Sequence, residues 1–252
     1  MLHKTTRILT SMTLLPLLTT SYAMNCDEIL EMPVDRKLSL QELQMIPPKD
    51  MVQCMAHLSR EQMKNEEASY IWTTLIDHFG GVANVPDNIL MLLHWVTPAI
   101  PPEHFSNMTL SSIDVIENFG LNYNLNENQI AALADRVRED FAGKEPEDYT
   151  YYDLTALRQI LCGFNRSEIE RIHPAAYREA ALIISKLERC NPAVLAGFAT
   201  LAVQEDAFGP PASWSESTWE VVGSQTVGEY VGAKGPQRPT VVTAAPSNNT
   251  TY

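Results

Sequence analysis

The sequence predicts an all-α fold made of short helices, and three observations support this class. Apolar residues recur every three or four positions, as they do along one side of a helix. The 16 prolines and 11 glycines divide the chain into many short elements. Alternation of apolar and polar residues, which is typical of a half-buried strand, is almost absent.

The first 23 residues have the pattern of a cleaved secretory signal. Lys4 and Arg7 form a positive region, and the apolar run that follows over 8–18 is too short to span a membrane. Ala23 suits signal peptidase, so we expect cleavage after it; the alternative is an uncleaved signal anchor. The last residues, PSNNTTY, lack the hydrophobic tail of a glycolipid-anchor signal, and no later apolar run approaches a transmembrane span. We therefore expect a secreted, extracellular protein.

The chain that follows the signal is predicted to begin with short helices and one longer helix. Ser59 and Gln62 have the spacing of a capping box before the longer helix, which is expected to end at Gly80 and Gly81. The shorter helices are expected near 38–46, 50–58, 87–96, 110–119, 151–163 and 214–222.

Three further helices carry clear start signals. Asn126 and Gln129 are expected to cap a helix with polar residues on its other face. Its apolar stripe consists of Ile130, Leu133, Ala134, Val137 and Phe141. Pro174 and Pro192 suit the first turns of two later helices, with Asn191 as the N-cap of the second.

Helices this short cannot each bury an apolar stripe alone, so they must stack as a compact bundle or as a solenoid of helix pairs. Residues 51–63 and 159–172 share a cysteine between apolar residues, then a polar cap and an acidic helix start, which suggests a repeat. We expect one helical domain over 24–230. Gly, Pro, Thr, Ser and Asn dominate 231–252, which predicts a flexible, disordered C-terminal tail.

The four cysteines and the glycosylation triplets fit an oxidising compartment. An even cysteine count favours two disulfides, for which three connectivities exist. The equal spacing of 28 residues favours Cys26–Cys54 and Cys162–Cys190; a zinc site is the alternative, but no close Cys/Cys or Cys/His pair occurs. N-glycosylation triplets begin at Asn107, Asn165, Asn248 and Asn249.

Several blocks resemble the mesothelin, stereocilin and otoancorin family of extracellular proteins. They are LRQILCGFNRSEIERI at 157–172, NPAVLAGFATLA at 191–202, GPPASW at 209–214 and WEVVGSQTVG at 219–228. The block MVQCMAHLSREQM at 51–63 is similar to a further copy of the same helix junction. The resemblance implies an armadillo-like superhelical stack of short helices and a role in adhesion. The chain differs from members that are longer or carry a membrane anchor.

No catalytic, cofactor-binding or metal-binding pattern is present, so we expect a protein that is not an enzyme. His78, His94 and His104 lie near one another in the sequence, but their spacing matches no metal site, and structural roles at helix ends are favoured. The run from 124 to 128 has too few acids for a calcium loop and lacks its central glycine. Trp214 and Trp219 would be splayed apart on a helix, so at least one is expected in the core.

The expected function is that of a secreted or cell-surface-associated glycoprotein without enzymatic activity, acting in cell–matrix or cell–cell adhesion. Its partner would be an extracellular or cell-surface protein or glycan, through which it could be held at the cell surface. The formal net charge of −13 opposes binding to nucleic acid or to anionic membranes. The alternatives are a secreted helical carrier of a lipid or small ligand, and an enzyme of unrecognised type.

Overall fold

The computed structural model describes residues 23–33, 35–141, 143–223 and 226–231. All regular structure in these ranges is helical, without a strand, so the predicted all-α class is confirmed. The α-helices are α1 (Cys26–Leu30), α2 (Leu40–Leu43), α3 (Pro48–Gln53), α4 (Met55–Leu58), α5 (Asn65–Phe79), α6 (Asp87–Leu90), α7 (Pro102–Phe105), α8 (Ile113–Gly120), α9 (Glu127–Asp140), α10 (Tyr151–Leu157), α11 (Arg166–Arg171), α12 (Pro174–Ile184), α13 (Pro192–Ala202) and α14 (Glu216–Val222). The 3₁₀ helices are η1 (Val82–Asn84), η2 (His94–Ala99), η3 (Pro146–Asp148), η4 (Arg158–Gly163), η5 (Pro211–Ser213) and η6 (Val227–Tyr230).

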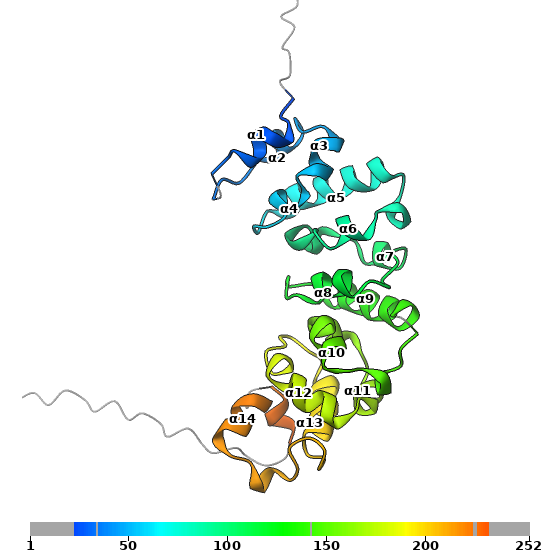
Figure 1. The fold of residues 1–252 in the computed structure, drawn as a ribbon, viewed down its shortest axis with the longest axis vertical. Coiled ribbons are helices and arrows are strands. Elements are labelled where there is room, and N and C mark those ends of the chain that lie inside the picture. The colour runs from blue at the N-terminus through cyan, green and yellow to red at the C-terminus, as the bar shows by residue number, and fades with distance from the viewer. Residues whose placement is uncertain (1–22, 34, 142, 224–225, 232–252) are drawn as a thin grey trace, which may run out of the picture.

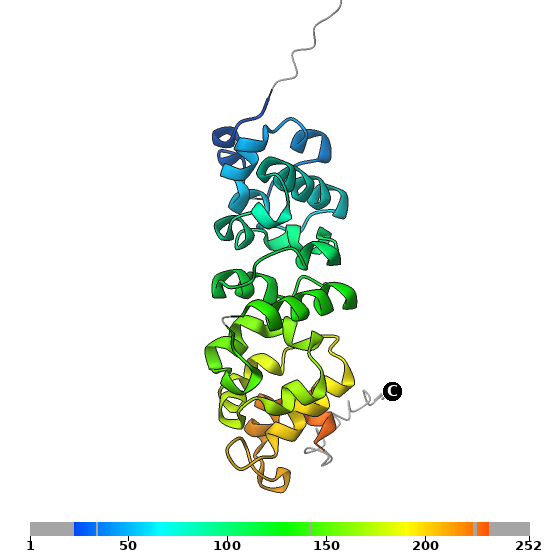
Figure 2. The same cartoon turned by 90° about the vertical axis from the view of Figure 1, so that its right-hand side faces the viewer.

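The helices follow one another along the long axis of the molecule in chain order (Figure 1, Figure 2). Helix α8 packs on α10, α10 on α12 and α12 on α14, whereas α7 packs on α9, α9 on η4 and α11 on α13. One apolar core runs through the stack from Met24 to Val227. Most of the predicted signal, and all of the predicted tail beyond Val231, lie outside the described residues.

Capping boxes explain where many of the short helices begin. Asn126 Oδ1 accepts a hydrogen bond from the Gln129 N–H at 3.0 Å, and Gln129 Oε1 accepts the Asn126 N–H at 3.0 Å, as predicted. Helices α1, α2, α10 and α11 start with the same reciprocal pair. Asn191 caps α13 by accepting from the Ala193 N–H, and the prolines stand in the first turns of α12 and α13 as predicted.

The predicted cap at Ser59 is wrong. Ser59 is fully buried at the end of α4, and its hydroxyl donates to the carbonyl oxygen of Leu92 at 2.5 Å. Helix α5 starts six residues later, where a carboxylate oxygen of Glu67 accepts the Lys64 N–H at 3.0 Å. Ser59 therefore satisfies a backbone group elsewhere in the stack. The predicted end of this helix is confirmed, because Gly80 adopts the left-handed conformation with φ 74°.

Three predicted helices are interrupted. The segment 50–58 divides into α3 and α4 at Cys54, 87–96 divides into α6 and η2, and 151–163 divides into α10 and η4. His94 has φ 34° and Arg158 has φ 40°, and an α-helix cannot continue through a residue in that region. The breaks turn the chain so that both pieces can pack on neighbours.

The two tryptophans are not splayed apart. The ring centroids of Trp214 and Trp219 lie 4.8 Å apart in an edge-to-face contact. The expectation was wrong because Trp214 precedes α14 and has extended backbone, so helical spacing does not separate the pair. Trp219 is buried, which confirms that at least one belongs to the core.

The cysteines pair as the spacing predicts. The Cα atoms are 5.6 Å apart in Cys26–Cys54 and 4.7 Å apart in Cys162–Cys190, and both pairs span 28 residues. Each disulfide therefore closes a local loop.

No helix in the described ranges has the length and apolarity needed to cross a membrane.

Candidate binding cleft

An open cleft of about 570 Å³ lies beside the second disulfide. Three segments line it: 122–131 from the α8–α9 loop and the start of α9, 159–164 from η4, and 188–192 from the α12–α13 loop. We call this site the amide cleft. Chain segments more than 60 residues apart in sequence meet here, since Arg189 contacts Asn124 across a separation of 65 residues.

The walls of the amide cleft are tied together covalently and by hydrogen bonds. The Cys162–Cys190 disulfide links the η4 wall to the α12–α13 loop. Gln159 adds two bonds to the same loop: its Nε2 donates to the Glu188 carbonyl oxygen, and its Oε1 accepts the Glu188 N–H at 3.3 Å. The α12–α13 loop is thus held at Glu188 and at Cys190. These two attachments fix the shape of the cleft without a ligand.

Two residues with positive φ face each other at this cleft. Asn124 has φ 59° and Arg189 has φ 54°, and the Arg189 guanidinium donates to Asn124 Oδ1. Asparagine tolerates this conformation, but for arginine it is uncommon and costs free energy. Such strained backbone clusters at ligand-binding sites, where the surrounding structure enforces it.

The four exposed asparagines of the cleft share one arrangement. Each side-chain oxygen accepts a hydrogen bond from within the protein: Asn122 from the Asn124 N–H at 3.2 Å, Asn126 from Gln129, Asn191 from Ala193, and Asn124 from Arg189. These bonds orient the amides. Within the described part of the chain, the NH₂ groups of the four have no acceptor. The cleft therefore presents hydrogen-bond donors to solvent.

Charged and apolar groups complete the lining. Glu127 and Glu188 are exposed carboxylates beside the donors, and Ile130 and Phe164 form buried apolar parts of the lining. Both cysteines of the lining are in the disulfide and cannot act as nucleophiles. This set offers hydrogen bonds of both kinds to a polar ligand with carbonyl or hydroxyl groups.

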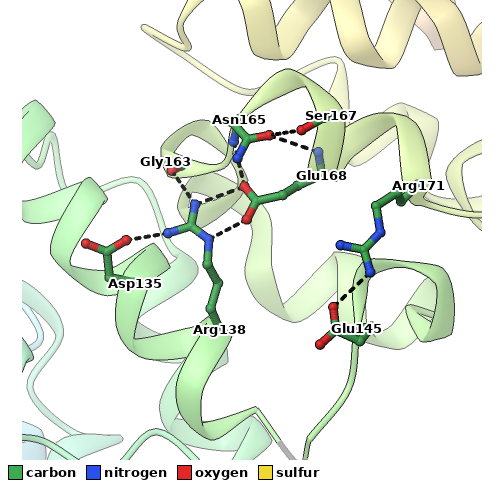
Figure 3. Close-up of polar contacts among 8 residues, drawn as sticks. All are labelled: Asp135, Arg138, Glu145, Gly163, Asn165, Ser167, Glu168 and Arg171. Atoms are coloured by element: carbon green, nitrogen blue, oxygen red, sulfur yellow. Dashed lines mark hydrogen bonds and ion pairs between the residues drawn. The ribbon is translucent and has the colours of Figure 1, made fainter.

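Arg138 on α9 supports the η4 wall (Figure 3). Its Nε donates to Glu168 Oε1 at 2.6 Å, while its Nη2 donates to Glu168 Oε2 and to the Gly163 carbonyl oxygen, both at 3.0 Å. The guanidinium carbon also lies 5.0 Å from the centroid of the Phe164 ring. Arg138 thereby joins α9, the end of η4 and α11 through one side chain.

The electrostatics of this cluster favour ionised groups. Burial alone would raise the pKa of Glu168, but hydrogen bonds from Arg138 and from the Asn165 N–H outweigh it and hold the pKa below its usual value. Arg171 pairs with Glu145 at 2.9 Å and with Glu147 at 2.7 Å, and its hydrogen bond lowers the pKa of Glu147. The contact with Glu145 also appears in Figure 3.

The two described glycosylation triplets differ in their surroundings. Asn165 directly follows Phe164 and is exposed at the N-cap of α11; its Oδ1 accepts from the Glu168 N–H at 3.0 Å and the Ser167 hydroxyl at 2.6 Å (Figure 3). Its Nδ2, the atom to which a glycan would be attached, has no acceptor in the described chain. Asn107 is also exposed, but its Nδ2 donates to the Glu103 carbonyl oxygen at 2.9 Å. Asn248 and Asn249 lie outside the described residues, and glycosylation stays a prediction.

The histidines are dispersed among structural contacts. His104 Nδ1 accepts the indole N–H of Trp72 at 2.9 Å, His94 Nδ1 lies 3.1 Å from the Tyr123 hydroxyl, and His78 packs edge-on against Phe79. In the ranges that the structure describes, no three His, Cys, Asp or Glu side chains could hold a metal ion.

Ala23, the predicted cleavage position, is exposed just before α1.

No pattern in the sequence predicted the amide cleft. Its one local signal is the run of alternating asparagines from 122 to 128, of which 124–128 suggests no more than an incomplete calcium loop. Asn191 was correctly assigned as a helix cap, but its nearness to that run depends on tertiary packing. A comparison with protein-family models finds no match, and a comparison with curated proteins finds no significant match.

Proposed function

We propose that this chain is a secreted, non-enzymatic glycoprotein of cell–matrix or cell–cell adhesion, built as an armadillo-like helical solenoid. It binds an extracellular or cell-surface protein or glycan through the amide cleft. The observation that carries the binding role is the set of four oriented, exposed asparagine amides whose donors lack a partner.

A regular separation of about 30 residues between bonded side chains supports the solenoid. Ser59 reaches the Leu92 carbonyl across 33 residues, Trp72 reaches His104 across 32, and Gln129 reaches the Ile100 carbonyl across 29. The Arg138–Glu168 pair spans 30 residues and each disulfide spans 28. In a solenoid each repeat contacts mainly its neighbours, so contacts recur at the length of one repeat.

Close backbone approach supports the same arrangement. A Cβ on Gly120 would lie 2.1 Å from the Ala156 carbonyl oxygen, and one on Gly163 would lie 2.6 Å from that of Ile130. Gly197 is likewise pressed against Ile169. Glycine at these positions lets successive repeats stack without a gap.

Two further lines support the extracellular role. The resemblance of 157–172 and 191–202 to the mesothelin, stereocilin and otoancorin family favours adhesion. Two disulfides are compatible with an oxidising, extracellular setting. The adjacent, exposed Asn165 triplet would place a glycan at the rim of the cleft, where it would limit the size of the partner.

The test is saturable binding of the mature protein, labelled at one site, to intact cells and to deposited matrix. In the double variant Asn122→Asp/Asn124→Asp, each side chain keeps the oxygen that accepts its internal bond and loses the outward NH₂ donor. We expect at least tenfold weaker binding, about 1.4 kcal/mol, with the melting temperature nearly unchanged.

Asn128→Asp is the control for each of the two changes, because Asn128 is exposed on α9 outside the cleft lining and gains one negative charge, as each single substitution Asn122→Asp or Asn124→Asp does. Binding should be unaltered in this variant. Treating the cells with glycosidases or with protease assigns the partner as glycan or protein. Absence of saturable binding to every surface, or full binding by the double variant, would refute the proposal.

A further inference from the structure

The two disulfides differ in how far a reactant can reach them from solvent. Cys26 and Cys54 are each 2% exposed, so their bond lies inside the core. Cys162 and Cys190 are half-buried, and both line the open amide cleft. Thiol–disulfide exchange requires an incoming thiolate to reach a sulfur atom, and exposed disulfides are the more readily reduced ones. A protein with a reactive dithiol can therefore reach the second disulfide and not the first.

The surroundings of the second disulfide favour attack at one of its two sulfur atoms. Gln159 Nε2 donates a hydrogen bond to Cys162 Sγ at 3.2 Å. Such a donor stabilises the thiolate form of the sulfur, and the sulfur that forms the more stable thiolate leaves faster. Arg189 directly precedes Cys190 and offsets the negative charge of Glu188 toward an incoming thiolate. Attack is thus expected at Cys190, with Cys162 as the leaving group.

Cleavage of this bond would free the α12–α13 loop and leave the helices beside it in place. Without the disulfide, the two bonds between Gln159 and Glu188 still join the loop to η4. Ile184 of α12 and Phe198 of α13 are fully buried, so the core holds each helix independently of the loop. Arg189 has φ 54°, which costs free energy, and a freed loop can relax this conformation.

We propose that Cys162–Cys190 is a regulatory disulfide, which a dithiol oxidoreductase reduces and thereby weakens binding at the amide cleft. A thiolate of the oxidoreductase attacks Cys190 Sγ, and the electron pair of the S–S bond leaves with Cys162 Sγ, which takes up a proton. The second thiol of the oxidoreductase then attacks the mixed disulfide. It forms the oxidoreductase's own disulfide and releases Cys190 as a thiol. Two electrons and two protons pass to this protein in total.

The first experiment measures reduction alone and needs no binding partner. The folded mature protein is treated with thioredoxin, kept reduced by its reductase and NADPH, and is alkylated with iodoacetamide at timed intervals. We expect Cys162 and Cys190 to be alkylated at least about tenfold faster than Cys26 and Cys54, the internal control. A thioredoxin whose second cysteine is replaced by serine should be trapped on Cys190. Equal rates, faster reduction of Cys26–Cys54, or a trapped link to Cys162 would overturn the proposal.

The second experiment compares the selectively reduced protein with the oxidised protein. We expect faster trypsin cleavage after Arg189, at least about fivefold weaker binding to cells and matrix, and unchanged helical circular dichroism. The Cys26→Ser/Cys54→Ser variant keeps only the second disulfide, and reduction should weaken its binding as it does that of wild type. Loss of helical circular dichroism on selective reduction would overturn the proposal, because the disulfide would then hold the fold and not the loop.

The regulatory role rests on the binding role proposed for the amide cleft, and the two can fail separately. Equal binding by the oxidised and the selectively reduced protein, or equal trypsin cleavage after Arg189, would overturn the regulatory disulfide and leave the binding role standing. If the oxidised protein binds to no surface, the proposed function fails and the regulation of binding fails with it.

Discussion

The side-chain amide of Asn118 donates a hydrogen bond to the backbone carbonyl oxygen of Leu90 at 2.9 Å. Its own oxygen accepts the Tyr123 hydroxyl at 3.0 Å, and that hydroxyl lies 3.1 Å from His94 Nδ1. Burial raises the pKa of Tyr123 to about 12, so the phenol keeps its proton and donates it to Asn118. His94 Nδ1 must then be the donor to the tyrosine oxygen. This chain of bonds joins α6, η2, α8 and the α8–α9 loop.

Asn118→Leu should lower the free energy of unfolding by about 1–3 kcal/mol for each buried group that it leaves unpaired. Those groups are the Leu90 carbonyl and the Tyr123 hydroxyl. Urea denaturation followed by circular dichroism measures the loss. The matched change Asn128→Leu, at an exposed position of α9, should stay within about 0.5 kcal/mol. Equal effects of the two changes would show that Asn118 does not join the helices energetically.

Gly120→Ala should destabilise the protein by about 1–3 kcal/mol or more, because the new methyl group meets fixed backbone. Its nearest atoms are the carbonyl oxygens of Ala156 at 2.1 Å and Leu157 at 2.8 Å. Thermal unfolding measures the effect. Asp114→Ala, at an exposed position of the same helix, is the control and should change stability little. A Gly120→Ala protein as stable as wild type would contradict the close packing of α8 on α10.

Acidification below pH 6.5 should weaken the bond network of His94. Burial lowers the folded-state pKa of His94 below its ordinary value, so the folded protein binds fewer protons than the unfolded chain in this window. The stability from His94 is therefore present above pH 6.5 and is lost as the pH falls through the folded-state pKa. His94→Gln keeps a donor for Tyr123 without titrating, so its melting temperature should fall less than that of wild type between pH 7 and pH 5. If the melting temperatures of His94→Gln and of wild type fall equally between pH 7 and pH 5, the prediction is contradicted.

The Arg138–Glu168 pair should contribute to acid sensitivity at lower pH. The pKa of Glu168 in the folded protein is held below 4.5. The stability that its carboxylate contributes is therefore present above pH 4.5 and is lost as the pH falls through this folded-state pKa. Arg138→Met removes the bidentate partner, and stability at pH 7 should fall while the further loss between pH 4.5 and pH 3 becomes smaller. Unfolding midpoints across this range test the effect. A variant with unchanged stability at pH 7 would show that the pair adds nothing.

Replacing Cys162 and Cys190 together by serine should lower stability by about 3–4 kcal/mol in the chain-entropy account of a 28-residue loop. Because this disulfide also holds the α12–α13 loop, trypsin should cleave the variant faster after Arg189. The Cys26→Ser/Cys54→Ser variant is the comparison, since it loses an equal loop at the other end of the stack. Peptide mapping without reduction should link each pair, and a Cys54–Cys162 link would refute the local pairing.

The sequence alone determined the features that depend on neighbouring residues. The stripe of α9 and its Asn126 cap follow from helical geometry over a few turns, so periodicity and spacing were enough to find them. The disulfide pairing was also accessible, because each pair closes a loop within one stretch of about 30 residues.

Only the tertiary structure decided the role of residues whose partners are distant in sequence. Ser59 has the sequence of a helix cap, yet burial against Leu92 made its hydroxyl a partner for a backbone carbonyl that would otherwise be unpaired. The amide cleft depends on Asn124 meeting Arg189 across 65 residues, and no local pattern encodes that contact. The physical reason is that capping and periodicity act within a helical turn, whereas the placement of these side chains is set by how the helices share one apolar core.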